Sequence, residues 1–401
     1  MTMNNPTMNK AAHADMLIAS AREMIPFLKE KGPQHDIDKR ISNEVARKLR
    51  DNGFFRICQS RENGGFGLRP SVLWRVTREV ARGDSASAWI LSLAGLHPWV
   101  GGMFSPQAQD EVFKDGTDAV IIALTGNVGR GVDVQFDGSH FTLNGKWTYA
   151  SGIDVADWAA VLVEAEVEGR KGRYLLLVPQ SSFEIDDASW NVLGLRGTGS
   201  KDVYLKDEKV PVHRCISWDD LQQLKFPGSA RNKDPMYQIP HTSLFAMSVA
   251  AAVAAVGHGM LDLYCDALQR RIPVGLNHAQ LEDRFSMAEL GKAASRLDMA
   301  FNQLMHDVDE MYDRAEAGYA FTIADRAKYR ANAAVLSEVV MESVNIMVRN
   351  IGGSLLPNGP IERCFRDIHS MASHFLLQTN HAAELYGRAL MGLELPPNAR
   401  I

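Results

Sequence analysis

Two segments combine aromatic rings, hydroxyl groups and glycine in a pattern that can hold a flat heteroaromatic ring. Residues 147–152 read Trp-Thr-Tyr-Ala-Ser-Gly at the end of a predicted strand, and residues 195–200 read Leu-Arg-Gly-Thr-Gly-Ser at the start of another. Tyr149 or Trp147 would pack on the face of such a ring, while hydroxyl and backbone N–H groups would bond its polar edge. Aromatic residues beside glycine turns are also ordinary β-barrel corners, so the two segments alone leave both interpretations open.

Other common chemical signatures are missing from the sequence. The Gly-x-Gly steps at 129–131 and 197–199 lack the third glycine of a dinucleotide-binding loop, and no Gly-x-Ser-x-Gly hydrolase elbow occurs. His374 and His381 are seven residues apart, two helical turns, and no His-Glu-x-x-His motif is present. We therefore expect no metal site. The four cysteines are spread singly, which favours buried free thiols over zinc ligands or disulfides.

Length and charge narrow the class of protein. The 401 residues carry 43 Lys and Arg against 48 Asp and Glu, a net charge of −5, so no basic field exists to hold nucleic acid. The most apolar stretch, 244–256, is about 13 residues long, short of the roughly 20 that span a bilayer. The N-terminal segment is polar and lacks the apolar core of a secretory signal. These features predict a cytoplasmic protein without nucleic-acid or membrane partners.

The elements that must position the two segments fall into three groups. Apolar residues at near 3-4-4 spacing predict a helix over 37–52, ended by Gly53, and further helices follow Pro70 and span 83–96. Between 118 and 212 the apolar runs become short and rich in β-formers, with turn signals between them, as is typical of an antiparallel barrel or sandwich. Long helices are then predicted over 242–268, 281–317, 323–350, 360–376 and 378–390, which favours a bundle.

This order, together with several motifs, resembles the acyl-CoA dehydrogenase fold. The likeness rests on residues 150–152 and 195–200, Arg271, Ile351-Gly-Gly353 and the Arg-Cys-Phe-Arg-Asp run at 363–367, and extends from about residue 15 to 397. The resemblance implies an α+β protein with an N-terminal helical domain over 1–117, an antiparallel β-barrel domain over 118–215 and a C-terminal four-helix bundle over 216–401.

Within that superfamily the chain resembles the oxygenase components of two-component flavin-dependent aromatic monooxygenases, the group that includes p-hydroxyphenylacetate hydroxylase. Residues 190–200 and 387–392 carry this closer likeness. The resemblance implies catalytic roles for His374, Ser151 and His97. It implies flavin contacts from Trp89, Tyr149, Ser151, Arg196, Thr198, Ser200, Arg271, Gly352 and Gly353, and substrate contacts from His97, Trp99, Phe375 and Leu376.

The resemblance also implies a mechanism. A separate reductase releases FMNH₂ or FADH₂, which diffuses to the oxygenase and reacts with O₂ to a C4a-hydroperoxide that hydroxylates a small aromatic compound. Ser151 would bond flavin N5, His374 would act as base or hold the ring, and Arg271 would reach the flavin phosphate of a neighbouring subunit in a homotetramer. The apolar run at 121–123 and Leu376 suit a phenol or an indole, for example an indole-acetate-like acid.

Two alternatives stay open. Many acyl-CoA dehydrogenases carry a catalytic Glu eight residues past the Arg-Asp pair, and Phe375 stands at that position here. Because some dehydrogenases place this base on another helix, an FAD enzyme that oxidises a thioester remains an alternative. A non-catalytic relative that binds flavin or another ligand is the second.

Overall fold

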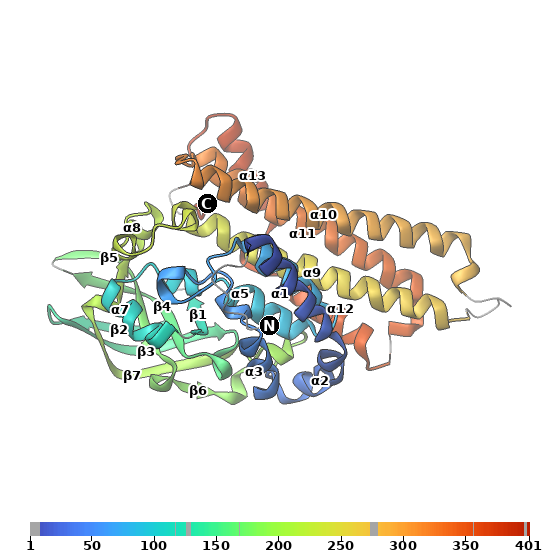
Figure 1. The fold of residues 1–401 in the computed structure, drawn as a ribbon, viewed down its shortest axis with the longest axis horizontal. Helices are drawn as coiled ribbons and strands as arrows, with labels where there is room; N and C mark the ends of the chain where they lie inside the picture. The colour runs from blue at the N-terminus through green and yellow to red at the C-terminus, as the bar shows by residue number, and fades with distance from the viewer. Residues whose placement is uncertain are drawn as a thin grey trace.

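The N-terminal part of the chain is helical and packs against both the strands and the C-terminal helices that follow. The computed structural model describes residues 9–116, 118–125, 130–167, 169–272, 280–355, 357–396 and 399–401. The first helices are α1 (Lys10–Glu23), α2 (Ile25–Asp38), α3 (Asn43–Asp51), α4 (Pro70–Ala81), α5 (Ser85–Ala94), α6 (Pro98–Gly101) and α7 (Pro106–Val112). Figure 1 shows α1, α2 and α3 against the rest of the molecule, at the blue end of the colour bar.

The helix predicted over 37–52 is wrong at its start. Lys39 ends α2 in a left-handed conformation (φ 55°), and Ile37 is 67% exposed, so it does not join the buried stripe. A new helix, α3, begins after Ser42, whose hydroxyl accepts the N–H of Val45 at 3.2 Å. Helix spacing continued across the break by chance, whereas the N-cap marks the true start. Gly53 follows the helix with φ 70°, as expected.

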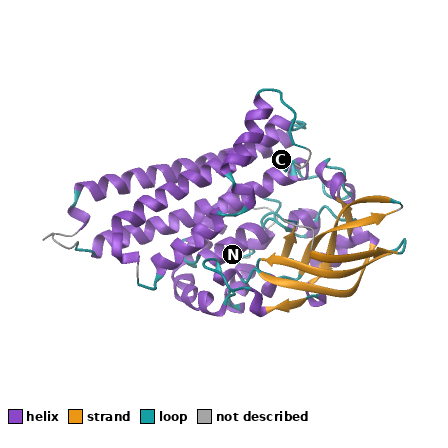
Figure 2. Ribbon diagram, turned by 180° about the vertical axis from the view of Figure 1, so that it is seen from behind, coloured by secondary structure: helices purple, strands orange, loops and turns teal. Residues whose placement is uncertain are grey.

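The middle of the chain forms two four-stranded sheets. The strands are β1 (Ile121–Leu124), β2 (Arg130–Phe136), β3 (His140–Ala150), β4 (Trp158–Val167), β5 (Arg170–Pro179), β6 (Glu184–Asp186), β7 (Lys201–Pro211) and β8 (Cys215–Ser217). One sheet has the order β1-β4-β5-β8 and the other β2-β3-β7-β6. Figure 2 shows both at one end of the molecule. Of the barrel or sandwich expected from the sequence, the strands form two sheets with a core between them. One pairing differs from the expected antiparallel pattern, because β1 pairs with β4 in parallel.

Both faces of the β1-β4-β5-β8 sheet are buried. Val161 and Leu176 lie opposite each other on β4 and β5 and pack in the core between the two sheets. The next pair, Leu162 and Leu175, belongs to the core shared with the helices. A sheet covered on both sides reads as a continuous apolar run, which is what β4 and β5 show. This sheet is the layer that connects the outer sheet to the helical body.

The long helices of the C-terminal half run away from the sheets: α9 (His241–Arg270), α10 (Arg284–Glu316) and α11 (Ile323–Ile351) (Figure 1). The shorter helices are α8 (Trp218–Gln222), which lies beside β5, α12 (Pro360–Ala372) and α13 (Thr379–Leu390). The helix predicted over 360–376 ends at Ala372, because a short 3-10 turn over Phe375–Leu377, here η13, follows. A capping box at Thr322 fixes the start of α11, and an N-cap at Asp283 fixes the start of α10.

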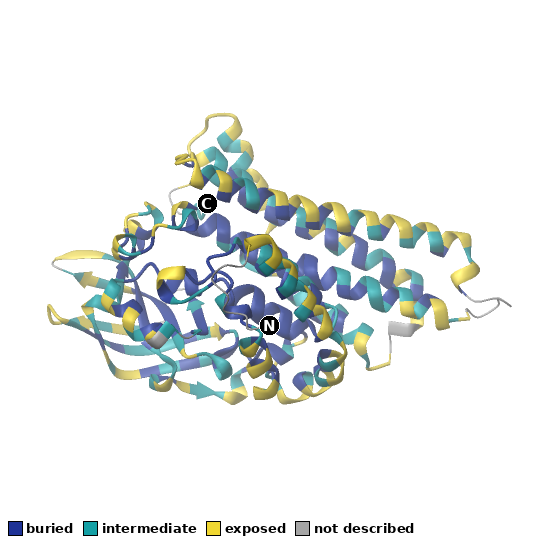
Figure 3. Ribbon diagram, viewed as in Figure 1, coloured by how far each residue is buried: buried dark blue, intermediate teal, exposed yellow. Residues whose placement is uncertain are grey.

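One core joins the N-terminal and C-terminal helices. It contains Leu73 and Val76 of α4, Leu91 of α5 and Val253 of α9, all fully or almost fully buried. Figure 3 shows α9 buried along its length, while the outer face of α10 is exposed. Helices α9 and α11 are long and apolar enough to cross a membrane by length and composition alone. Of the most apolar 18-residue stretch of each helix, 89% is buried inside the protein in α9 and 50% in α11. The apolar character of α9 is therefore accounted for by its central place in the core.

The four cysteines are free thiols, as predicted. Cys58 and Cys364 are buried, whereas Cys215 and Cys265 are only partly covered, so the expected burial holds for two of them.

Candidate active site

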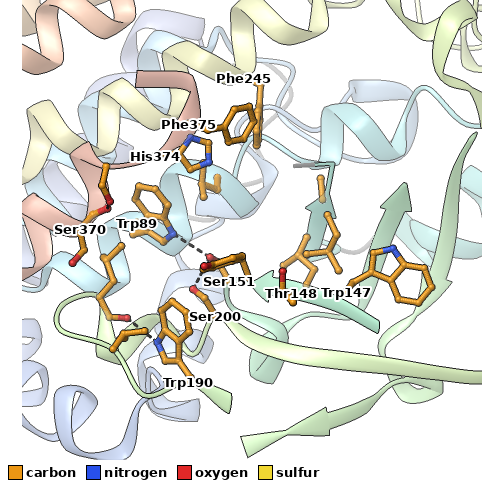
Figure 4. Close-up of a pocket in the computed structure, with 18 of the residues that line it drawn as sticks. Trp89, Trp147, Thr148, Ser151, Trp190, Ser200, Phe245, Ser370, His374 and Phe375 are labelled. Carbon is orange, nitrogen blue, oxygen red and sulfur yellow. Dashed lines mark hydrogen bonds between the residues drawn. The ribbon is translucent and has the colours of Figure 1, made fainter. Parts of the chain in front are cut away.

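A cavity of about 700 Å³ opens where the sheets meet α5, α9 and the end of α12. Its size falls in the range of small-molecule and cofactor sites. Residues from both sheets and all three helices line it: Trp89, Leu93, His97, Ile122, Ala123, Leu124, Lys146, Trp147, Thr148, Tyr149, Ser151, Trp190, Val192, Gly194, Leu195, Ser200, Phe245, Ser370, Ser373, His374 and Phe375. Figure 4 shows Trp89, Ser151, Ser200, His374 and Phe375 around a common space. The ring of Trp147 points away from it, and its Nε1 donates to the carbonyl oxygen of Leu162 at 3.1 Å.

One wall carries a directed chain of hydrogen bonds. Trp89 Nε1 donates to Ser151 Oγ at 3.2 Å, and Ser151 Oγ lies 2.7 Å from Ser200 Oγ (Figure 4). Ser200 Oγ in turn lies 2.7 Å from Thr198 Oγ1. Thr198 Oγ1 donates its hydrogen to the carbonyl oxygen of Leu195 at 2.8 Å. Each hydroxyl has a single hydrogen, so Ser200 must donate to Thr198, and Ser151 must donate to Ser200. Ser151 therefore presents a lone pair to the cavity.

The opposite wall is apolar apart from two histidines. Ile122 and Leu124 of β1, Phe245 of α9 and Phe375 of η13 supply its surface. His97 stacks on Phe245 with 5.8 Å between ring centroids, and His374 lies edge-on to Trp89 at 6.2 Å. Figure 4 shows Phe245, His374 and Phe375 together on one side of the cavity, away from Ser151 and Ser200.

The two histidines show opposite polarity. His97 Nδ1 lies 3.0 Å from the carbonyl oxygen of Ile121, which can only accept, so Nδ1 carries the hydrogen and Nε2 is an acceptor. That buried Nε2 has no hydrogen-bond partner among the described residues. His374 Nδ1 instead accepts the N–H of Leu376 at 3.3 Å, so its hydrogen lies on Nε2. Burial lowers the pKa of each ring to about 4, and both are neutral at pH 7.

Local backbone geometry places these groups. Asp84 caps α5 by accepting the N–H of Ser87 at 3.0 Å, which directs the helix that carries Trp89. Gly152 turns the chain with φ 78° immediately after Ser151, where a side chain would be strained. Tyr149 and Leu195 take left-handed conformations at the cavity without being glycine, with φ 63° and 59°.

The structure brings together seven of the predicted site residues. His97, Trp89, Tyr149, Ser151, Ser200, His374 and Phe375 all line the cavity. Thr198 stands behind Ser200 and acts through it. Arg196 is not among the lining residues, and its described contact is its carbonyl oxygen, which accepts from Trp190 Nε1 at 3.1 Å.

Two predicted substrate contacts lie elsewhere. Trp99 is fully buried and stacks on His241 with 5.6 Å between centroids, outside the cavity lining. Leu376 is 1% exposed, and its backbone N–H orients His374. Both expectations of direct substrate contact are corrected, because these apolar side chains turn into the core.

Arg271, Gly352 and Gly353 are not among the residues that line the cavity, and Arg271 lies close to Gly352. Arg271 Nη1 donates to Gln280 Oε1 at 2.9 Å and to the carbonyl oxygen of Asn350 at 3.1 Å. A Cβ added to Gly352 would lie 3.4 Å from Arg271 Nη2. The group sits where α9 and α11 end, far from the sheets (Figure 1).

Several lining residues escaped sequence reasoning. Ser370 precedes His374 by four residues, a spacing that would have pointed to it, whereas Ser373 is the adjacent residue, which helical spacing places on another face. Phe245 lies in the uniformly apolar α9, where no sequence signal separates a cavity residue from a core residue.

Known proteins resemble this chain over most of its length. The model of the acyl-CoA dehydrogenase C-terminal domain matches residues 247–379. The flavin-dependent monooxygenase oxygenase subunit HsaA of Rhodococcus jostii (strain RHA1) is 30% identical over 375 residues, covering 93% of this chain and 97% of that protein. The FADH(2)-dependent resorcinol hydroxylase oxygenase component of Rhizobium sp. (strain MTP-10005) is 26% identical and covers 96% of this chain and 93% of that protein.

The chain belongs to the oxygenase subunits of flavin-dependent monooxygenases. A solved structure of 3-HSA hydroxylase from Rhodococcus sp. RHA1 superposes with a TM-score of 0.89 at 28% identity, covering 97% of this chain and 99% of that one. The acyl-CoA dehydrogenase-like fold, the monooxygenase activity and the use of reduced flavin are thereby confirmed. These similarities favour a monooxygenase over the two alternatives, a dehydrogenase that oxidises a thioester and a non-catalytic relative. Oxygenase subunits of this kind work with a separate reductase.

Proposed function

We propose that this oxygenase subunit hydroxylates a neutral phenol or indole-type compound, with the flavin ring on the hydroxyl wall and the substrate on the apolar wall. The observation that carries the proposal is the division of one cavity into a hydrogen-bonded polar wall and an apolar wall with a single buried unpaired acceptor, His97 Nε2. Reduced flavin, when bound, would supply the two electrons that activate O₂, so that one oxygen atom enters the aromatic ring and the other leaves as water.

The polar wall fits a reduced flavin. N5 of a reduced flavin carries a hydrogen, whereas N5 of an oxidised flavin is an acceptor. Ser151 has given its own hydrogen to Ser200 and so offers an acceptor. Trp89 and Tyr149 supply aromatic surface beside it, and Trp190 lies edge-on to Tyr149 at 6.1 Å. These residues favour the reduced cofactor that a separate reductase delivers.

The apolar wall fits a phenolic hydroxyl or an indole N–H. His97 Nε2 would accept that hydrogen, and His374 Nε2–H would donate to an oxygen at the opposite end of the ring. Because burial lowers the pKa of His97 to about 4, this residue polarises the O–H bond and orients the ring, rather than storing a proton. The surrounding Phe and Leu side chains exclude water from the reacting atoms.

Charge favours a neutral substrate over a carboxylic acid. Lys146 is the only charged residue among the described residues that line the cavity, and its Nζ lies 2.5 Å from Asp202. A carboxylate on the substrate would lose its hydration without gaining a free cation, which is costly. The indole-acetate-like acid expected from sequence is thus disfavoured relative to a neutral fused-ring compound.

The remaining parts of the proposal concern assembly. We place the flavin phosphate of a neighbouring subunit at Arg271, Gly352 and Gly353, within a homotetramer formed through the C-terminal helices. The protein receives FMNH₂ or FADH₂ by diffusion and works in the cytoplasm. We also propose that the chain divides into three domains at about residues 117 and 215. The last strand of the middle domain, β8, ends at Ser217.

A matched pair of substrates tests the function. With reduced flavin supplied by any flavin reductase, 2-naphthol should give hydroxylated product, while 6-hydroxy-2-naphthoic acid, the same ring with a carboxylate, should give at least tenfold less. Comparable yields from both would refute the neutral-substrate assignment. Hydrogen peroxide alone across a panel of phenols and indoles would refute aromatic hydroxylation itself.

A further inference from the structure

Leu195 lines the cavity in a backbone conformation that leucine rarely adopts. Its φ of 59° lies in the left-handed region, where the Cβ of a non-glycine residue crowds the backbone. Such a conformation persists only where its surroundings hold it, and an observed outlier of this kind at a cavity points to a positioning device. The hydrogen bonds around Leu195 identify that device.

Both backbone groups of Leu195 are held. Its N–H donates to Asp367 Oδ1 at 2.6 Å. Its carbonyl oxygen accepts from Trp190 Nε1 at 3.0 Å and from Thr198 Oγ1 at 2.8 Å. The Thr198 bond is the end of the hydroxyl chain that begins at Ser151. A displacement of Leu195 would therefore pass directly to the hydroxyl groups of the polar wall.

The same stretch of α12 also holds the residues just before Leu195. Arg366 Nη1 donates to the carbonyl oxygen of Leu193 at 2.7 Å. A Cβ on Gly194 would overlap the carbonyl oxygen of Arg366, so only glycine permits this approach of loop and helix. Because α12 continues to Ser370 and leads to His374, one helix contacts both the polar-wall loop and the substrate wall.

Asp367 is an expensive residue to bury. It is 2% exposed, and no cation pairs with it among the described residues. Arg366 turns to Asp36 and Glu362, and the neighbouring Asp84 is paired with His35 at 3.0 Å. Burial, with the charge of Asp84, raises the pKa of Asp367 to about 7. The partners of this carboxyl are the hydroxyl of Ser85 and the N–H of Leu195. A buried carboxylate without an ion pair lowers the stability of the folded protein, because its charge is removed from water without compensation.

We propose that Asp367 is a positioning residue, which holds Leu195 in its left-handed conformation and thereby sets the hydroxyl chain of Thr198, Ser200 and Ser151 against the flavin ring. The consequence for flavin rests on the proposed function, whereas the latch between Asp367 and Leu195 does not. A loss of the latch loosens residues 192–200 and weakens flavin binding without touching the flavin itself.

Asp367→Ala tests the latch first and the function second. Hydrogen–deuterium exchange of peptides covering 192–200, measured without flavin, should become at least tenfold faster. The dissociation constant of reduced flavin should rise about tenfold, and hydrogen peroxide release should rise with it. Unchanged exchange in a folded variant would overturn the latch. Faster exchange with unchanged flavin affinity would leave the latch in place and overturn its positioning role.

Asp307→Ala is the matched control. Asp307 is equally buried, and burial likewise raises its pKa, but it binds the amides of Gln303 at 2.9 Å and Asn332 at 2.8 Å within the bundle. Its substitution should lower the melting temperature and leave exchange of 192–200 and flavin affinity within twofold of the parent protein. Equal effects from both variants would mean that Asp367 acts only through overall stability.

Asp367→Asn covers the case in which the alanine variant does not fold. An amide oxygen accepts a weaker hydrogen bond than a carboxylate. At pH 8 the asparagine variant should therefore exchange severalfold faster over 192–200 and bind reduced flavin about threefold more weakly. At pH 6, where Asp367 is mostly protonated, the difference should shrink. Identical behaviour of the two proteins at pH 8 would overturn the proposal.

Discussion

The two walls of the cavity differ in how their polar atoms are used. On the polar wall, Trp89, Ser151, Ser200 and Thr198 form one directed chain in which each hydroxyl hydrogen has an acceptor. On the apolar wall, His97 Nε2 is buried without a partner in the described structure. A satisfied network is rigid and specifies one geometry, whereas an unpaired buried acceptor is costly until a ligand supplies its hydrogen. In the proposed function the polar wall is thus preorganised for the cofactor, and the apolar wall is completed by the substrate.

In the proposed function, this difference would let a shared activity accommodate different substrates. Relatives include a resorcinol hydroxylase and an indole-3-acetate monooxygenase, which is 21% identical to this chain. We expect the polar wall to meet the flavin that the family shares, while the apolar wall can change one side chain at a time. The predictions below each break one wall and leave the other intact.

The largest effect is expected from His97→Phe. Phenylalanine keeps the ring that stacks on Phe245 but removes the acceptor. Loss of this positioned acceptor should lower the hydroxylation rate about 100-fold, the lower end of general acid–base contributions. Product formation in single turnover measures the rate, and reduced-flavin affinity should stay within twofold. A rate within threefold of the parent protein would remove His97 from substrate activation.

His374→Ala should have the next largest effect. It removes a donor rather than an acceptor, and a hydrogen bond of this kind contributes about 1 kcal/mol or slightly more. Hydroxylation should fall roughly tenfold, with flavin binding nearly intact. Unchanged product yield would refute the role of His374, and a large loss of flavin affinity would move it to the cofactor wall.

Ser151→Ala breaks the polar wall instead. It removes the acceptor offered to flavin N5 and interrupts the chain between Trp89 and Ser200. The loss of one such bond should raise hydrogen peroxide release about fivefold relative to product. Ser373→Ala is a suitable control, because Ser373 lines the same cavity but its hydroxyl donates to the carbonyl oxygen of Ser370 at 2.7 Å. Tight coupling in Ser151→Ala would exclude the proposed contact.

The smallest effect concerns stability against pH. Burial lowers the pKa of His97 from 6.5 to about 4, so the folded protein binds a proton less readily than the unfolded chain. The stabilising contribution is complete above pH 6.5 and is lost as the pH falls toward 4. Between pH 6.5 and 5.5 this amounts to about 1 kcal/mol. Urea unfolding of His97→Phe should show a shallower acid-side loss by that amount, and parallel curves would contradict it.

Much of the architecture was predictable because it depends on local sequence. Apolar spacing identified the long C-terminal helices to within a few residues. The short β-rich runs at 119–124, 141–143, 159–163, 174–178 and 203–205 predict strands, and each overlaps one of the eight strands of the described residues. The short β6 and β8 and the polar β2 were missed, since they carry few apolar residues and depend on pairing with neighbours. Helix spacing also ran falsely through Lys39, where a left-handed residue ends one helix.

The sequence by itself determined the chemical groups, their order and the family to which they belong. Only the tertiary structure decided which way each hydrogen bond runs. The acceptor role of Ser151 depends on Thr198, and the opposite polarities of His97 and His374 depend on two backbone groups, Ile121 C=O and Leu376 N–H. The latch joins Ser85, Leu195 and Asp367, which are up to 282 residues apart in the chain. Whether a hydroxyl group or a ring nitrogen donates or accepts depends on its partner. Several of these partners come from distant segments that only folding brings within hydrogen-bond distance.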